Sequence, residues 1–225
     1  MTGAPSLPFN ARKEPRQARS ATTVEAIYEA TIQVLLAEGP IRLTTTRVAS
    51  RAGVSVGTLY QYFPNKQSLF YAVNQRYLEG LADRVEAACL MHRGRSYLEM
   101  AEALVRTYIA VKIERRDVTR VLYLAAAEIS VADLVEQMTQ RVEAASEAMF
   151  SSASDATFDN LATVNLTILN VLFGTVRSFF DRDMADLLEE TISAQLVAMF
   201  RTALEAARSP VLPLDRDNPM TADRP

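Results

Sequence analysis

The sequence predicts an all-α protein of about nine helices, and three observations favour this fold class. Glycine is scarce, with 7 residues in 225, whereas the helix formers Ala, Leu, Glu, Gln and Met are common. Apolar residues make up 49% of the chain. They recur at intervals of three and four residues, which is the period of an amphipathic helix. We expect four parts, namely residues 1–19, 20–75, 76–208 and 209–225.

The first part, residues 1–19, contains Pro5, Pro8 and Pro15 and has no apolar period. Its basic residues are Arg12, Lys13, Arg16 and Arg19. Two interpretations stay open. The segment is either a basic arm that lies along a minor groove or the phosphates of DNA, or an ordinary solvated tail.

The first helix is predicted from Thr22 to Glu38. Thr22 and Glu25 have the spacing of a capping box, and Gly39-Pro40 ends the helix. Its predicted buried stripe consists of Val24, Ile27, Tyr28, Thr31, Val34 and Leu35. We expect this helix to support the next two helices from behind.

Residues 44–63, TTTRVASRAGVSVGTLYQYF, predict a helix-turn-helix. The first helix runs from about Thr45 to Arg51 and is capped by Thr44 or Thr45. Gly53 follows it, where a left-handed backbone is needed. Ser55 then caps a second helix, Val56 to Tyr62.

The second helix has two faces, because successive residues are 100° apart. Leu59 and Phe63 form the inward face, and Gly57, Thr58, Gln61 and Tyr62 are predicted to face outward, with Val56 and Tyr60 at the margin. Hydroxyls, an amide and aromatic rings suit phosphates, base edges and thymine methyl groups. The alternative is a buried helical hairpin in which Gly and Pro only mark the turns. The predicted DNA-contacting residues are Thr45, Arg47, Ser55, Val56, Gly57, Thr58, Tyr60, Gln61, Tyr62 and Lys66.

Pro64 stops the second helix, and Asn65 caps a long helix from Lys66 to about Leu90. This cap places Lys66 and a positive helix end where a phosphate binds. The long helix passes from the second part of the chain into the third. It is therefore the predicted lever between them.

Residues from about Arg19 to Val73 resemble the DNA-binding domain of the tetracycline-repressor (TetR/AcrR) family of transcriptional regulators. The matching run is TTTRVASRAGVSVGTLYQYFPNKQSLFYAV, which follows a helix ending in LLAEG and contains the spacing TLYxYFxNKxxL. The match covers about a quarter of the chain. The resemblance implies an all-α homodimer, a ligand pocket in the C-terminal part, and repression that a small molecule relieves.

Five more helices are predicted after a break at His92–Arg95. Their approximate ranges are Tyr97–Arg115, Asp117–Ile129, Val131–Ser151, Thr157–Asp181 and Asp183–Ala207. The last two are predicted to form a dimer surface through two apolar stripes, and an entirely intramolecular core is the alternative. The stripes consist of Leu161, Val164, Ile168, Val171 or Leu172, Thr175 and Phe179, and of Leu187, Leu188, Ile192, Leu196, Met199 and Phe200.

The resemblance places a pocket for a small lipophilic effector between about Tyr77 and Phe173. A core or helix-cap role is the alternative for each candidate lining residue. Lys112, Arg115, Arg116 and Arg120 are interpreted as a solvated helix end, with an anionic-ligand site as the alternative. The candidate lining residues are Tyr97, Met100, Tyr108, Tyr123, Glu128, Met138, Met149, Asn165 and Phe173.

Charge is unevenly distributed along the chain. Residues 1–70 contain 8 Lys+Arg and 4 Asp+Glu, whereas the remaining residues contain 16 and 23. A basic head on an acidic body is typical of DNA-binding proteins. The single cysteine, Cys89, excludes an internal disulfide and favours the cytoplasm. No signal peptide is expected, and the apolar run from Leu161 to Val176 is too interrupted to predict a membrane span.

Enzyme motifs are absent from the sequence, which contains one histidine and no GxSxG, HExxH, CxxC or phosphate loop. We therefore expect no catalytic residue, metal or cofactor. The predicted function is a homodimeric repressor that a small effector releases from an inverted-repeat operator in double-stranded DNA. Two other classes stay open: a helical ligand-binding or adaptor protein with a degenerate head, and a helical enzyme.

Overall fold

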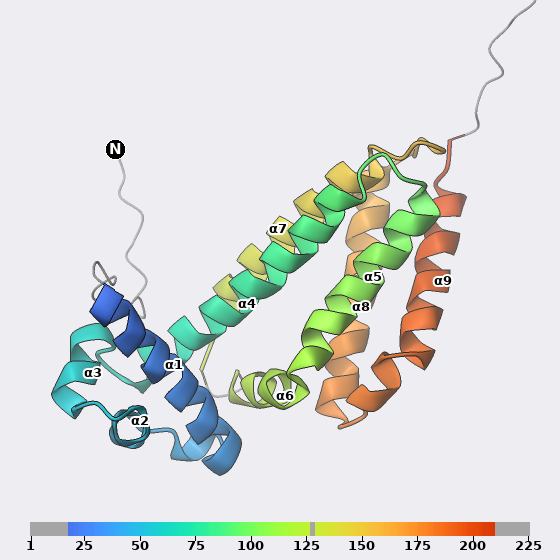
Figure 1. Cartoon of the computed structure of the whole chain (residues 1–225). Helices are drawn as coiled ribbons and strands as arrows, with labels where there is room; N and C mark the ends of the chain where they lie inside the picture. Colours follow the sequence, from blue (N-terminus) through green and yellow to red (C-terminus); the bar gives the residue numbers. More distant parts are fainter. Residues whose placement is uncertain (1–17, 127–128, 210–225) are drawn as a thin grey trace, which may run out of the picture.

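The computed structural model describes residues 18–126 and 129–209, and an N-terminal head and a larger body can be distinguished within them (Figure 1). These residues form helices throughout and one isolated β-bridge, between Phe158 and Arg208. The elements in order are α1 (Ala18–Glu38), η1 (Pro40–Arg42), α2 (Thr45–Ala52), α3 (Val56–Tyr62), α4 (Lys66–Met91), α5 (Tyr97–Glu114), α6 (Arg116–Ala125), α7 (Ala132–Phe150), α8 (Leu161–Asp181), η2 (Ala185–Leu188) and α9 (Thr191–Ala206).

The head consists of α1, α2, α3 and the first turns of α4 around one apolar core. Burial of the side chains of this core removes apolar surface from water, which is the main favourable contribution to folding. From the head, α4 continues as a single rod along the body, with α7 behind it (Figure 1). The predicted long connecting helix is therefore confirmed. The fully buried side chains of the head core include Ile27, Leu35, Leu43, Val48, Leu59, Phe63, Leu69 and Phe70.

The first helix begins earlier than predicted. Because α1 starts at Ala18, Thr22 lies inside the helix, and its predicted capping box with Glu25 is wrong. Glu25 instead forms an ion pair with Arg76 of α4. An N-cap has to precede the first helical residue, so an upstream extension of one turn removes Thr22 from that position.

The last predicted helix, Asp183–Ala207, divides into η2 and α9. Asp183 has a left-handed backbone with φ 58°, and the Met184 amide donates to the Phe179 carbonyl at 2.9 Å. Asn160, with φ 54°, likewise precedes the start of α8 at Leu161. Asn and Asp adopt this conformation more readily than other side chains, so these two residues permit the chain to turn.

The predicted dimer stripes are partly wrong, because much of each stripe packs inside its own body. Five of the named residues are buried, while other side chains of α8 and α9 face solvent, including Leu166 at 45% and Met199 at 51% exposure. Among the described residues one helix, α8, has the length and apolar composition of a membrane span. A core helix passes the same test, and α8 contributes to the core of the body. The buried stripe residues are Ile168, Leu172, Leu188, Leu196 and Phe200.

Candidate DNA interface

Two capped helices and a left-handed turn form the predicted helix-turn-helix. Thr44 Oγ1 accepts a hydrogen bond from the Arg47 amide at 3.3 Å at the start of α2. Gly53 follows α2 with φ 68°. Ser55 Oγ then accepts from the Thr58 amide at 2.9 Å at the start of α3. Each cap satisfies a helix-end donor, which confirms both predicted starts and the predicted turn.

The second helix of the motif, α3, presents one face to solvent. Leu59 is 0% and Phe63 is 1% exposed, and the Phe63 ring lies 5.7 Å from the ring of Tyr28 in α1. These contacts fix α3 on the head. Gly57, Tyr60 and Gln61 are exposed, and Val56 and Thr58 are half-buried. The predicted inward positions of Leu59 and Phe63, the outward positions of Gly57 and Gln61 and the marginal position of Val56 are confirmed, whereas Thr58 is less exposed and Tyr60 more exposed than predicted.

Tyr62 is an exception, and its predicted outward position is wrong. Its side chain is 9% exposed, and its ring centroid lies 6.4 Å from that of Phe63. Tyr62 follows Leu59 by three residues, and residues at this spacing are neighbours on one helix face. The side chain of Tyr62 therefore turns toward the core with Leu59.

A hydrogen bond between hydroxyl groups connects the two helices of the motif. Thr45 Oγ1 lies 3.1 Å from Tyr60 Oη, and Thr45 is itself only 9% exposed. Thr45 thus positions the Tyr60 ring, which remains 44% exposed. The hydroxyl of Thr45 faces Tyr60 and not open solvent, although Thr45 is one of the predicted DNA-contacting residues.

The two predicted cationic contacts are Arg47, within α2 of the motif, and Lys66, just after the motif. Arg47 donates to the Arg42 carbonyl at 2.8 Å and pairs with Glu38 at 3.2 Å, so its guanidinium is held against the end of α1. Lys66 is exposed at the first position of α4. Asn65 and Ser68 form a capping box there, which the sequence analysis did not identify beyond Asn65. The first amides of α4 have no intrahelical acceptor and present a positive helix end next to Lys66.

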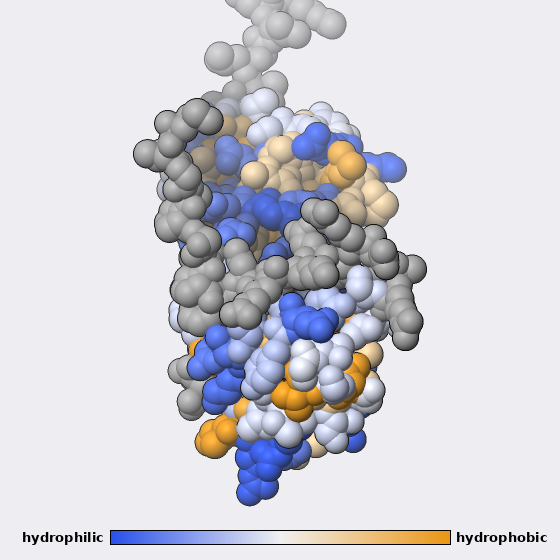
Figure 2. Space-filling model, turned by 90° about the vertical axis from the view of Figure 1, so that its left-hand side faces the viewer, coloured by the Kyte–Doolittle hydropathy of each residue, from blue (hydrophilic) through white to orange (hydrophobic). Residues whose placement is uncertain are grey.

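The stretch of sequence that contains the motif has no acidic residue. Residues 39–78 contain five basic residues and no Asp or Glu. Figure 2, which views the molecule from the side of the head, shows hydrophilic and intermediate residues with small separate hydrophobic patches. Such a surface suits a polyanion better than an apolar partner. The predicted basic arm lies outside the described residues, except for its last two positions.

Six of the predicted effector-pocket residues are packed in the core of the body. Tyr97, Met100, Tyr108, Met138, Met149 and Asn165 are buried, and Glu128 lies outside the described residues. The amide of Asn165 accepts from Ser146 Oγ at 2.9 Å and donates to the Glu143 carbonyl at 3.0 Å. These bonds join α8 to α7 and satisfy the buried amide. Tyr108 and Phe173 do meet, with ring centroids 5.0 Å apart.

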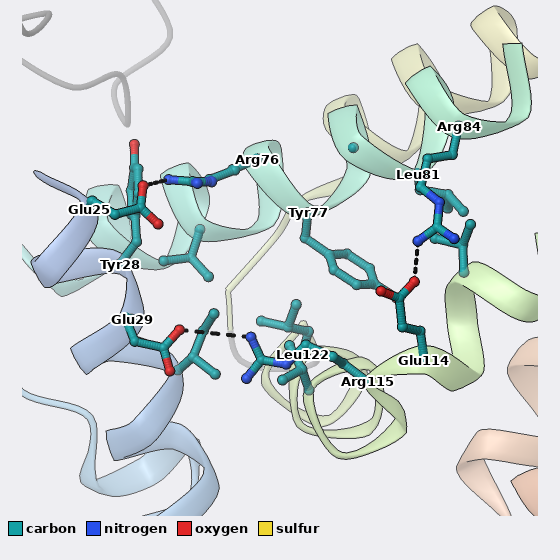
Figure 3. Close-up of a pocket in the computed structure, with 15 residues that line it drawn as sticks. Glu25, Tyr28, Glu29, Arg76, Tyr77, Leu81, Arg84, Glu114, Arg115 and Leu122 are labelled. Atoms are coloured by element: carbon teal, nitrogen blue, oxygen red, sulfur yellow. Dashed lines mark hydrogen bonds and ion pairs between the residues drawn. The ribbon is translucent and has the colours of Figure 1, made fainter. Parts of the chain in front are cut away.

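A cavity of about 310 Å³ instead lies between the head and the body. Its walls come from α1, α4, α5 and α6, and Figure 3 shows Tyr77 reaching across it from α4. None of the predicted pocket residues lines it. Side chains from four helices remote in sequence form this cavity, so no local pattern predicts it. Within the described part of the chain, no three His, Cys, Asp or Glu side chains gather where they could hold a metal ion.

Three comparisons with known proteins agree with this geometry. Residues 20–73 match the family model described as "Bacterial regulatory proteins, tetR family". The chain is 33% identical over 99 residues to the nucleoid occlusion factor SlmA of Haemophilus ducreyi, covering 44% of this chain and 48% of that protein. It is 30% identical over 135 residues to SlmA of Vibrio atlanticus, covering 56% and 65%. The chain therefore spans about half to two thirds of these relatives.

Solved structures share the fold over most of the chain. A transcriptional regulator from Rhodococcus sp. RHA1 matches with a TM-score of 0.66 and 18% identity, over 82% of this chain and 97% of that one. A TetR-family transcriptional regulator from Streptomyces coelicolor matches with a TM-score of 0.58 and 22% identity, over 82% and 99%. At these identities the likeness establishes the all-helical fold, including the body that the family model does not cover.

Proposed function

We propose that this chain, which belongs to the tetR family of bacterial regulatory proteins, is a homodimeric cytoplasmic repressor that a small effector releases from an inverted-repeat operator. The observation that carries the proposal is the orientation of α3. Its apolar side chains Leu59 and Phe63 are fixed in the core, while Gly57, Tyr60 and Gln61 face solvent. A helix held in this way can enter a major groove with its polar side toward the bases.

Each exposed group has a role in this proposal. Gln61 offers an amide to a base edge, and Gly57 permits close approach of the backbone to the groove. Lys66 and the free amides of α4 bind a phosphate. Tyr62 is buried against Phe63, so we assign it a role in the packing of α3 and no contact with DNA. Thr45 acts through the ring of Tyr60, which it positions.

Dimerisation through α8 and α9 is supported by the composition of their exposed faces. From Leu161 to Val176 and from Thr191 to Phe200 the chain contains no charged residue. Leu166 and Met199 are about half-exposed on these helices, and the small residues Gly174 and Ala198 are exposed on the same two helices. A second copy that covers this uncharged surface would remove it from water. Two heads would then reach successive major grooves, about 34 Å or a multiple of it apart.

The test begins with selection of duplexes from the organism's own DNA by the purified protein. Fluorescence anisotropy then measures operator affinity as a function of salt concentration. We expect Lys66→Ala to weaken binding to all sequences and to reduce the slope of log affinity against log salt by about one. Gln61→Ala is expected to cost about 1–3 kcal/mol and to relax selectivity at one base pair.

Tyr60→Ala removes both the exposed ring and its bond to Thr45, and it is also expected to weaken the complex. Arg106→Ala, an exposed arginine on α5, serves as the control that removes a charge far from the head. Unchanged operator affinity in both the Tyr60 and the Lys66 variants would contradict the proposed interface. Failure of the wild-type protein to select any duplex would instead favour an adaptor with a degenerate head.

A second candidate function is nucleoid occlusion. The observation that favours it is the similarity to SlmA proteins, which are named nucleoid occlusion factors. The same selection experiment separates the two functions. A repressor is expected to bind a few sites beside the genes that it controls, whereas a nucleoid occlusion factor is expected to bind sites spread over the chromosome.

A further inference from the structure

Lys112, in the last two turns of α5, is buried, in contrast to its predicted position on a solvated helix end. Its side chain is 1% exposed, while Arg115, Arg116 and Arg120 do face solvent, so that interpretation is wrong for Lys112. Lys112 follows the buried Tyr108 by four residues and therefore lies on the same inward face. Among the described residues no carboxylate pairs with its ammonium, and no hydrogen bond of Nζ is found. A buried charge without such partners is costly and unusual.

Three tyrosine rings surround this ammonium. Lys112 Nζ lies 4.9 Å from the ring centroid of Tyr77, 5.0 Å from that of Tyr123 and 5.6 Å from that of Tyr108. Contact with the ring faces offsets part of the cost of burial. The guanidinium carbon of a second cation, Arg177, lies 4.2 Å from the ring centroid of Tyr123. Arg177 is paired with Asp181 at 2.9 Å. Among the described residues, the buried amine of Lys112 therefore has no negative partner.

Tyr77 separates this charge from the cavity between the head and the body. Its ring contacts Lys112 and also lines the cavity. Its hydroxyl lies 2.7 Å from Thr119 Oγ1, which in turn donates to the Lys112 carbonyl at 2.8 Å. Outward rotation of this one side chain would join the cavity to the ammonium.

The cavity has an apolar floor and a charge-balanced rim. Each acidic side chain of the rim is paired with an arginine: Glu25 with Arg76, Glu114 with Arg84, and Glu29 with Arg115 at 3.7 Å (Figure 3). The rim therefore neither attracts nor repels an anion strongly, whereas the buried Lys112 attracts one. The apolar lining residues are Ile32, Val73, Leu81, Val111, Val118 and Leu122.

We propose that this cavity binds a small amphipathic carboxylic acid, whose chain lies on the apolar floor and whose carboxylate reaches Lys112 past the ring of Tyr77. The acid supplies the missing counter-ion in a site of low dielectric, where a charge-assisted hydrogen bond is strong. The inference rests on the proposed function, since it names the class of effector. Because α1 provides Glu29 and Ile32, the bound acid contacts the DNA-binding head directly.

The first experiment compares three probes of equal chain length, octanoate, octan-1-ol and octylamine, on the full-length protein by isothermal titration calorimetry. We expect octanoate to bind about tenfold more tightly than octan-1-ol, and octylamine to bind no better than the alcohol. Lys112→Met keeps an unbranched side chain that is one atom shorter and removes the charge, so this variant should lose the preference for the acid. Arg106→Met, on the exposed side of the same helix, should retain it. Equal binding of acid and alcohol, tighter binding of the amine, or an undiminished acid preference in Lys112→Met would overturn the proposal.

The second experiment fills the cavity without touching Lys112. Gly80 of α4 lines the cavity, and a Cβ at this position meets no atom within 4 Å. Gly80→Leu should therefore fold and lose octanoate binding, while Gly80→Ala should fold and keep it. Retention of full octanoate affinity by Gly80→Leu would exclude this cavity as the site.

Operator binding without any probe separates the two proposals. Lys112→Met is expected to bind operator as the wild-type protein does, since Lys112 lies outside the head. If the wild-type protein binds no operator, the proposed function fails while the calorimetric preference for octanoate still stands. If the wild-type protein binds operator but shows no preference for octanoate over octan-1-ol, the effector inference alone fails.

Discussion

At the residue scale, single hydrogen bonds determine where the DNA-binding helix begins. Ser55 Oγ accepts a hydrogen bond from the Thr58 amide at 2.9 Å and lies 2.8 Å from Thr58 Oγ1. The Ser55 side chain therefore provides an acceptor for an amide at the start of α3 that has no partner within the helix. The sequence predicted this cap because Ser precedes a short apolar-periodic segment. It did not predict the bond between Thr45 and Tyr60, which joins residues 15 positions apart.

Replacement of Ser55 by Ala is expected to reduce the free energy of unfolding by about 1 kcal/mol, because an amide of α3 loses its acceptor. Urea unfolding followed by circular dichroism measures this change. The matched control is Ser50→Ala, since Ser50 is exposed within α2 and Ala has the higher helix propensity. A control that is as destabilised as Ser55→Ala would contradict the capping role.

Lys112 gives the protein a specific dependence of stability on pH. Burial lowers the pKa of folded Lys112 from 10.5 to about 7, and the charge of Arg177 acts in the same direction. Between these values the unfolded chain binds the proton and the folded chain does not, so the free energy of unfolding rises with pH. We expect this rise between about pH 7 and 9 in the wild-type protein and a flatter profile in Lys112→Met.

The other titratable groups that face Lys112 do not obscure this window. Tyr77, Tyr108 and Tyr123 have pKa values raised above 10.0 by burial. They therefore affect stability only above the proposed pH range. Identical pH profiles for the wild-type protein and Lys112→Met would contradict the buried position of the ammonium.

At the element scale, helix ends follow the sequence closely where a cap or a breaker is local. The predicted bounds of α3 are the observed ones, and α2 and α4 differ by one residue at their C-terminal ends. The error is larger at the start of α1 and on both sides of α8. At α8 the decision between helix and turn depends on Asn160 before it, Asp183 after it, and the helices that pack around them.

Gly53 and Gly80 provide a matched pair for the turn of the motif. A Cβ at either position meets no atom within 4 Å, but Gly53 alone has a positive φ, of 68°. Gly53→Ala is therefore expected to destabilise the head by about 1 kcal/mol through backbone strain. Gly80→Ala is expected to stabilise α4 by a similar amount, because Ala favours a helix interior. Thermal unfolding should therefore show a lower melting temperature for Gly53→Ala and a higher one for Gly80→Ala. Equal changes in the melting temperatures of the two variants would refute the argument from backbone conformation.

At the scale of the whole molecule, α4 connects the two parts that the function requires. It begins beside Lys66 in the head and packs against α5 and α7 in the body. The ion pair between Glu29 and Arg115 adds a second connection between head and body at 3.7 Å. A ligand between these parts can therefore change the angle of the head without a change in the motif itself.

The proposed dimer predicts that a charge on the outer face of α8 separates the subunits. Leu166→Glu is expected to convert the dimer to a monomer, measured by analytical ultracentrifugation, and to weaken operator binding, since only one head remains per molecule. Val135→Glu is the control, because Val135 is 43% exposed on α7, which is not one of the two proposed dimer helices. A dimer that persists in Leu166→Glu would place the subunit contact elsewhere.

The sequence by itself determined the all-helical fold, the position of the helix-turn-helix, and the outward direction of Gly57 and Gln61. These features depend on neighbours within four residues, because capping bonds and the 100° helical rotation act over that distance. Only the tertiary structure decided that Tyr62 and Lys112 are buried, which faces of α8 and α9 remain uncovered, and where the cavity lies. The reason is that a helix that is apolar on several sides has no preferred inward face of its own. Its orientation is decided by packing against helices that are remote in sequence.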